Sequence, residues 1–129
     1  MRIDVKAKEN SISGGTAKVT GLKVAPGDYL TITCAPTDVW KAGTSKEHTS
    51  NANGIPGKLY PINGSEQKFV VGSLIGSLDG GKTYFGIGTS LQMTIVTQGE
   101  LTLAYMDINN NDNSGMVTAI AQVYKVTGK

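Results

Sequence analysis

Glu100–Met106 reads ELTLAYM and continues directly into Asp107–Gly115, DINNNDNSG. In the first part, Leu101, Leu103 and Tyr105 occupy alternate positions, so they share one face of an extended strand. In the second part, six of the nine side chains carry a carboxylate or amide oxygen. The stretch predicts a half-buried β-strand that ends in a loop crowded with oxygen atoms.

The same strand pattern recurs along the chain, between turns rich in Gly, Asn, Asp and Pro. Seven further runs have it: RIDVKA (2–7), TAKVTGLKV (16–24), DYLTITC (28–34), QKFVVGSLIGSL (67–78), TYFGIG (83–88), SLQMTIV (90–96) and GMVTAIAQVYKV (115–126). The last run has two faces, formed by Val117, Ala119, Ala121 and Val123 and by Met116, Ile120 and Tyr124. The seventeen glycines oppose helices. We predict one all-β domain over residues 1–129, a β-sandwich of jelly-roll type.

Residues 36–66 do not follow the strand pattern. The segment is polar, rich in Gly, Asn and Pro, and holds the single tryptophan, Trp40, and the single histidine, His48. Structureless loops of this length are uncommon in compact domains and are usually functional or disordered. We expect a surface loop that lines a site, with Trp40 as a core or loop anchor.

The charge of the chain excludes some classes of partner. Twelve basic and ten acidic residues give a net charge of +2, spread along the sequence. This is too weak and diffuse to predict a nucleic-acid or membrane-surface partner. No apolar run approaches the ~20 residues of a membrane span, and MRIDVKAKEN is no signal peptide. We expect cytoplasmic synthesis without a signal peptide, with release or surface association left open.

The residues that usually carry catalysis are scarce. Cys34, the single cysteine, lies in an apolar run and is expected to be a small buried hydrophobe. A catalytic thiolate needs a nearby base, and His48 lies in a different kind of segment. No Ser-His-Asp spacing and no Gly-rich phosphate loop that opens a helix is present. We predict that the protein is not an enzyme.

The oxygen-rich loop 107–115 predicts a calcium site. Calcium takes about six to eight oxygen ligands from carboxylates, amides, carbonyls and water. Asp107, Asp112 and Asn113 supply such oxygens, and the two carboxylates match the charge of the cation. The alternative is a polar hairpin whose asparagines are present because they tolerate positive φ. Composition alone leaves both open.

Rival chemistries fit the loop less well. An EF-hand needs Gly at its sixth place and Glu at its twelfth, where this chain has Asp112 and Thr118. A glycosidase pair needs one carboxyl kept protonated, whereas amide donors and a cation lower carboxyl pKa values. Zinc prefers Cys and His ligands, of which one each is present.

The order of several motifs resembles the LecA-type galactophilic lectins of Pseudomonas and relatives. These motifs are PGDYLTIT, then Trp40, Glu47-His48, GSLIGSLDGG, FGIG and LTLAYMD…DNSG, and the resemblance spans about residues 2–126. It implies a calcium-dependent, galactose-binding β-sandwich of the galactose-binding-domain-like type, without a cleaved signal peptide. It also implies galactose-containing glycans as partners and a homo-oligomer, a tetramer or dimer.

The resemblance also implies a set of site residues. The metal ligands would be Asp107, Asp112, Asn113, a carbonyl of Asn109 or Asn110, and the carbonyl of Trp40. The sugar would contact His48, an amide at Asn51 or Asn53, and Asp107, Ile108 and Asp112.

The chain departs from the best-known member of that family in several places. Its calcium loop is about two residues shorter, Asp112 replaces an asparagine, Trp40 replaces a tyrosine, and the segment from Trp40 to His48 is shortened. The alternative function is a non-catalytic structural or interaction module whose calcium only stabilises the fold.

Overall fold

The computed structural model describes residues 1–62 and 66–125. Its elements are β1 (Arg2–Lys6), β2 (Lys18–Val24), β3 (Tyr29–Cys34), β4 (Trp40–Lys41), the 3-10 turn η1 (Lys46–His48), β5 (Thr49–Ser50), β6 (Leu59–Pro61), β7 (Lys68–Val70), β8 (Leu74–Ser77), β9 (Phe85–Gly86), β10 (Ser90–Thr94), β11 (Gly99–Tyr105) and β12 (Ser114–Tyr124). Every described element except η1 is a strand, which confirms the all-β prediction. No helix in the described part is long and apolar enough to cross a membrane.

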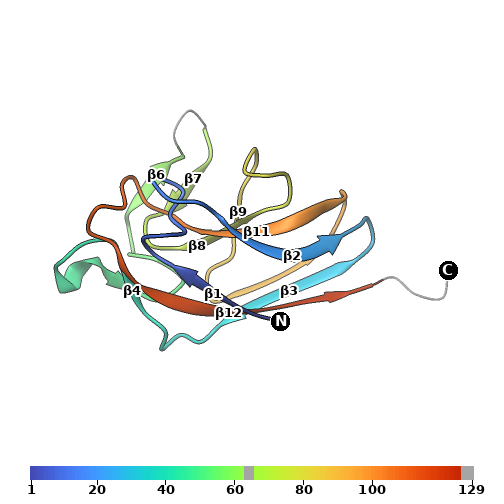
Figure 1. The fold of residues 1–129 in the computed structure, drawn as a ribbon, viewed down its shortest axis with the longest axis horizontal. Coiled ribbons are helices and arrows are strands. Elements are labelled where there is room, and N and C mark those ends of the chain that lie inside the picture. Colours follow the sequence, from blue (N-terminus) through green and yellow to red (C-terminus); the bar gives the residue numbers. More distant parts are fainter. Residues whose placement is uncertain (63–65, 126–129) are drawn as a thin grey trace.

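The strands form two antiparallel layers and a small ribbon (Figure 1). One sheet has the order β10-β3-β12-β4-β5, with β1 also paired to β12. The other has the order β2-β11-β8-β9, and β6 pairs with β7 in the ribbon. The chain passes from β11 in one sheet to β12 in the other, so the oxygen-rich segment lies between the layers at one end of the sandwich.

The core lies between the two layers and follows the predicted alternation. Leu101, Leu103 and Tyr105 of β11 are fully buried. On the inward face of β12, Val117, Ala119 and Ala121 are buried and Val123 is partly buried, whereas Met116, Ile120 and Tyr124 on the other face are exposed. A smaller cluster of Ile75, Ala104 and Met106 forms on the other face of the second sheet. The periodicity therefore predicted both faces of the longest strand correctly.

Cys34 lies in this core, as predicted. Its side chain is buried, and burial together with the nearby Asp38 raises the pKa of its thiol to about 11. The thiolate that a nucleophile or metal ligand needs is therefore disfavoured at neutral pH.

Two expectations about secondary structure were wrong. The run 67–78 is not one strand, because the chain turns at Gly72, whose φ is 87°, between β7 and β8. The segment 36–66 is not a structureless loop, because β4 and β5 add to the first sheet and β6 pairs with β7. Residues 63–65 and Val126, which belong to two of the predicted segments, lie outside the described residues.

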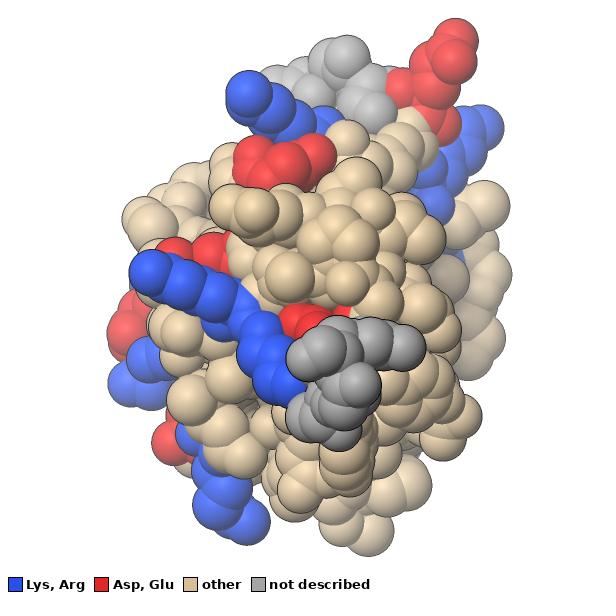
Figure 2. All heavy atoms as spheres, turned by 90° about the vertical axis from the view of Figure 1, so that its right-hand side faces the viewer, with Lys and Arg blue, Asp and Glu red and all other residues tan. Residues whose placement is uncertain are grey.

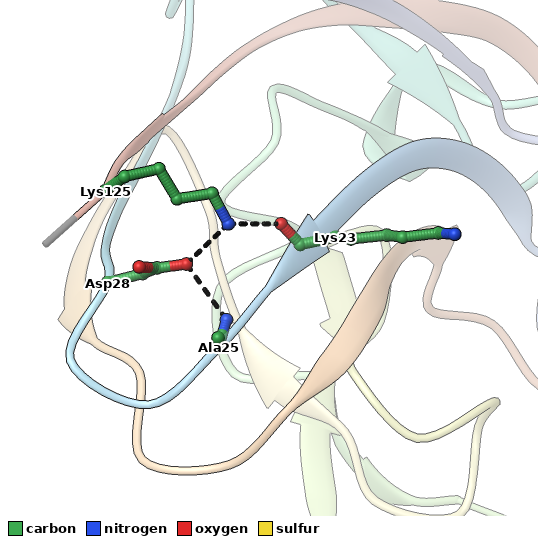
Figure 3. Close-up of polar contacts among 4 residues, drawn as sticks. All are labelled: Lys23, Ala25, Asp28 and Lys125. Carbon is green, nitrogen blue, oxygen red and sulfur yellow. Dashed lines mark hydrogen bonds and ion pairs between the residues drawn. The ribbon is translucent and has the colours of Figure 1, made fainter.

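The side chain of Lys125 links the two sheets at the end of the sandwich opposite the oxygen-rich loop (Figure 3). Lys125, just after β12, donates from Nζ to Asp28 Oδ2 at 2.8 Å and to the Lys23 carbonyl in β2 at 3.1 Å. Asp28 Oδ2 also accepts the Ala25 N–H at 2.9 Å. Elsewhere on this end, basic and acidic side chains are scattered rather than gathered into one patch (Figure 2).

Candidate functional site

The segment between β11 and β12 is a crossing between sheets and not a hairpin. The two strands pair with different neighbours: β11 with β2 and β8, and β12 with β1, β3 and β4. No non-glycine residue among the described ones has a positive φ. The asparagines of this segment therefore do not adopt the left-handed conformation. The alternative that they are present to form a hairpin turn is not supported.

Asp107 lies at the start of the crossing and is held by the backbone around it. The N–H of Met106 donates to Ser73 O at 3.0 Å, and Gly72 N–H donates to Met106 O at 2.7 Å. Asp107 is buried, and its Oδ1 accepts the Ile108 N–H at 2.7 Å. Its Oδ2 is buried without a hydrogen-bond partner.

The protonation of Asp107 reflects this burial. Desolvation raises the pKa of the Asp107 carboxyl, an effect that the Ile108 N–H, the Asn113 amide and His48 offset only in part. Among the described residues, His48 is the charged neighbour that favours the carboxylate, and it does not cancel the cost of burial, which a bound cation would offset.

Asn113 occupies the other end of the crossing, just before β12. Its Nδ2 donates to Ala7 O at 2.8 Å, and this bond fixes the orientation of the amide, with Oδ1 pointing away from Ala7 O. That oxygen, Oδ1, is buried without a partner. Among the described residues only one other buried side-chain polar atom lacks a partner, and it is Oη of Tyr105, which ends β11.

These unpartnered oxygens fit a cation. A buried oxygen without a partner costs roughly 1–3 kcal/mol, and Asp107 and Asn113 each carry one in the same short segment. The described residues bring together no three His, Cys, Asp or Glu side chains, so an ion here would depend on amide and carbonyl oxygens as well. Calcium accepts such a mixed oxygen set, whereas zinc does not favour it.

The middle of the crossing is more exposed. The side chain of Asn110 donates to Lys8 O at 3.0 Å, and its carbonyl accepts the Asn113 N–H at 3.3 Å. Asn109 is exposed and its Oδ1 accepts the Asn111 N–H at 3.4 Å. Asp112 is exposed. The carbonyls of Asn109 and Asn110 both remain candidate ligands, and Asp112 is a carboxylate that solvent already reaches.

Trp40 anchors the neighbouring segment, as predicted. Its indole N–H donates to Gly72 O at 2.7 Å and to Asn51 O at 3.2 Å, and its ring meets Tyr105 edge-on at 4.4 Å between centroids. Its backbone pairs with Gly115, two residues after Asn113. A Cβ on Gly115 would lie 2.9 Å from Trp40 Cα, so glycine permits this close approach. The backbone of Trp40 is thus at the edge of the crossing.

A pocket of about 200 Å³ opens beside Asp107. It is lined by Ala42, His48, Ile55, Lys58, Tyr60, Val71, Asp107, Ile108 and Asn109. The volume is below the ~300–1,000 Å³ of pockets for drug-sized ligands, and so suits a ligand of one ring. A larger hollow of about 440 Å³, next to Lys125, lies at the opposite end of the sandwich, away from the unpartnered oxygens.

The pocket brings together only part of the predicted sugar-contacting set. His48, Asp107 and Ile108 line it, whereas Asp112 and Asn51 do not. The Asn51 amide accepts the Asn53 N–H at 2.9 Å and donates to Pro36 O at 3.3 Å. The Asn53 oxygen accepts the Thr89 N–H at 2.8 Å. The Asn51 amide is therefore bonded to the protein through both its oxygen and its nitrogen, and the Asn53 amide through its oxygen.

His48 is placed by its neighbours. Its Nδ1 lies 3.2 Å from Ser45 Oγ, and a Cβ on Gly43 would lie 2.3 Å from the same nitrogen. Glycine at position 43 therefore leaves the room that the imidazole occupies beside the pocket.

Sequence reasoning missed Lys58 and Tyr60, which also line the pocket. Lys58 directly precedes β6 and Tyr60 lies within it, so the alternation of an extended chain puts both on one side. The available signal was this i, i+2 spacing, but it lay inside a segment interpreted as a loop.

Comparisons with known proteins show the fold alone. No protein-family model matches the chain, and no curated protein does. Among solved structures, one described as "EclA N-terminal domain; PllA-like lectin" is similar with a TM-score of 0.67. The match covers 95% of this chain and 94% of that one at 21% identity. The predicted β architecture is therefore one that a protein described as a lectin also has.

Proposed function

We propose that this protein is a calcium-dependent carbohydrate-binding protein without catalytic activity. Calcium would be held by the side chains of Asp107, Asp112 and Asn113 and by the carbonyls of Trp40 and of Asn109 or Asn110. The observation that carries the proposal is the pair of buried oxygens on Asp107 and Asn113 that lack a partner. The lectin description of a similar fold supports it.

The proposed ligand set leaves room for a second molecule. Calcium takes about six to eight oxygen ligands, so the protein alone does not complete its sphere. Two adjacent sugar hydroxyls can replace water in the remaining positions. A hydroxyl bound to calcium is a stronger donor, and charge-assisted hydrogen bonds to Asp107 or Asp112 would then hold the sugar.

The pocket beside Asp107 supplies the surface for the sugar. Its volume suits one ring, and His48 and Ile108 lie on its wall. We propose galactose, bound to the metal through O3 and the axial O4, with His48 toward O6. So small a site predicts modest affinity for a single sugar, and several sites in a homo-oligomer would provide useful avidity.

Thermal unfolding tests both parts of this proposal. A ligand that binds only the native state stabilises it by about 2.7 kcal/mol at a hundredfold excess over Kd. Calcium should raise the melting temperature above that in chelator, and galactose should raise it further where glucose does not. A rise with calcium and none with any sugar would instead favour a structural module, and identical melts in calcium and chelator would contradict a metal site.

A further inference from the structure

The wall of the pocket carries a positive charge that the proposed calcium ligands do not use. Of the lining residues, Lys58 is the basic one besides His48, and it is exposed. Tyr60, which is 40% exposed, lines the same pocket. Neither residue has a place in the calcium set proposed above.

The backbone fixes where the Lys58 side chain starts. Its N–H donates to Ile55 O at 3.2 Å, and its carbonyl accepts the Val71 N–H at 2.7 Å. Both backbone groups are therefore committed to the body of the fold. In the part of the chain that the structure describes, the Lys58 ammonium makes no ion pair and no hydrogen bond.

The Lys58 ammonium matters for ligand binding because calcium, once bound, compensates the acidic side chains of the site. Asp107 is the one acidic side chain on the wall, and in the proposed function its charge and that of Asp112 are compensated by calcium. The loaded site then keeps the Lys58 charge uncompensated. A neutral galactoside offers that ammonium hydroxyl acceptors but no opposite charge, whereas an anionic group on the adjoining sugar offers both.

We infer that Lys58, flanked by the ring of Tyr60, makes the site selective for glycans that carry an anionic group next to the metal-bound sugar. The inference rests on the proposed function and names its ligand class more narrowly. The shared chemistry is a singly charged oxyanion, which a carboxylate or a sulfate ester can supply. The Tyr60 ring offers a flat apolar surface for the carbon face of the adjoining unit.

Two matched pairs of disaccharides test the inference. Lactobionate and lactitol differ by a carboxylate in place of a hydroxymethyl group on the unit next to galactose. N-acetyllactosamine with and without a 6-sulfate on its glucosamine provides the second pair. By titration calorimetry in calcium at low salt, the anionic member of at least one pair should bind about two- to fivefold tighter, as expected for an exposed ion pair. The ratio of the two affinities within a pair should fall toward one near 1 M salt, where the screening length is about 3 Å.

Two lysine variants test whether the charge of Lys58 causes the preference for the anionic disaccharide. Lys58→Met keeps the side-chain stem and removes the charge, so the anionic and the neutral member of each pair should bind this variant with equal affinity. Lys68→Met is the matched control, because Lys68 belongs to the same ribbon but lines a different hollow with Leu59 and Phe69. That control should keep the preference.

The outcomes separate this inference from the proposed function. Calcium-dependent binding of lactitol with no preference in either pair would overturn the role of Lys58 alone. A preference that survives Lys58→Met would overturn it too. Absence of calcium-dependent binding to every galactoside would overturn the proposed function. A preference in only one pair would support the inference and identify the anion.

Discussion

Asp107 and Asn113 stand at the two ends of one crossing between sheets, and each keeps a buried side-chain oxygen without a hydrogen-bond partner. Neighbouring backbone fixes both side chains: Ile108 N–H binds the other oxygen of Asp107, and Ala7 O binds the amide nitrogen of Asn113. The two free oxygens are thus oriented before any ligand arrives. Preorganised ligands lose less entropy on binding, which favours a metal at this place.

Replacing Asp107 with asparagine should affect the metal-free and metal-bound protein in opposite directions. Without calcium, Asp107→Asn should raise the melting temperature at neutral pH, because it removes a charge whose cost of burial is offset only in part by its neighbours. Calcium affinity should fall by at least about tenfold, because the loop loses an anionic ligand. Melts in chelator and calcium calorimetry measure the two effects.

Asp112→Asn is the matched control, since Asp112 is exposed. It removes the same charge without relieving burial, so it should weaken calcium binding and leave the metal-free melting temperature unchanged. A metal-free Asp107→Asn protein less stable than the parent would show that the carboxylate has a favourable role in the fold.

The pH dependence of stability should carry the signature of Asp107. Burial raises the pKa of this carboxyl in the folded state, so its protonated form stabilises the native protein, fully so below the unfolded pKa of about 3.9. That contribution is lost as pH rises through the higher folded pKa. In metal-free denaturant melts from roughly pH 4 to 8, the advantage of Asp107→Asn over the parent should grow with pH and then level off. A difference that shrinks with rising pH would contradict the burial effect. Calcium, which needs the carboxylate, should bind more weakly as pH falls.

Gly43 should control the position of His48. In Gly43→Ala, the new Cβ would lie 2.3 Å from the imidazole, so the ring must move away from the pocket wall. Galactose binding should weaken as in His48→Ala, by about 1 kcal/mol for one hydrogen bond, and calcium affinity should stay unchanged. Gly86→Ala is the control, because a Cβ there meets only Phe69, at 3.9 Å. Unchanged galactose affinity in both position-43 and position-48 variants would remove His48 from the sugar site.

Cys34 should be inert in the native state. With its thiol buried and its pKa raised to about 11, a thiol reagent at neutral pH should modify it only when the protein unfolds. Cys34→Ala should cost about 1 kcal/mol of stability as a small cavity, with sugar binding retained. Fast labelling of the folded protein, measured by mass spectrometry, would contradict this placement.

Much of the fold followed from periodicity because a strand's two faces are encoded at alternate positions. Leu101, Leu103 and Tyr105 predicted the core, and the exposed face of β12 was equally plain. Pairing partners are not encoded in this way, which is why the segment after β11 could be interpreted as a hairpin although it joins two sheets. The turn at Gly72 was hidden for a related reason, since apolar residues continue on both sides of it.

The site was predictable in its chemistry and less so in its geometry. The oxygen content of residues 107–115 pointed to a cation, and the structure adds unpartnered oxygens on Asp107 and Asn113. Lys58 and Tyr60 were missed because their i, i+2 spacing lies in a polar segment whose strand, β6, is ordered by pairing with β7. Asn51 was predicted to contact the sugar, but its amide is hydrogen-bonded within the protein, and the polarity of the local sequence does not reveal this.

The coupling between calcium and galactose tests most directly whether sugar hydroxyls bind the metal. Binding linkage is reciprocal, so each ligand must change the affinity of the other by the same factor. We predict that saturating galactose lowers the calcium Kd several-fold in titration calorimetry, whereas glucose at the same concentration does not. A calcium Kd that is identical in galactose, in glucose and in buffer would show that the cation and the sugar do not share a site.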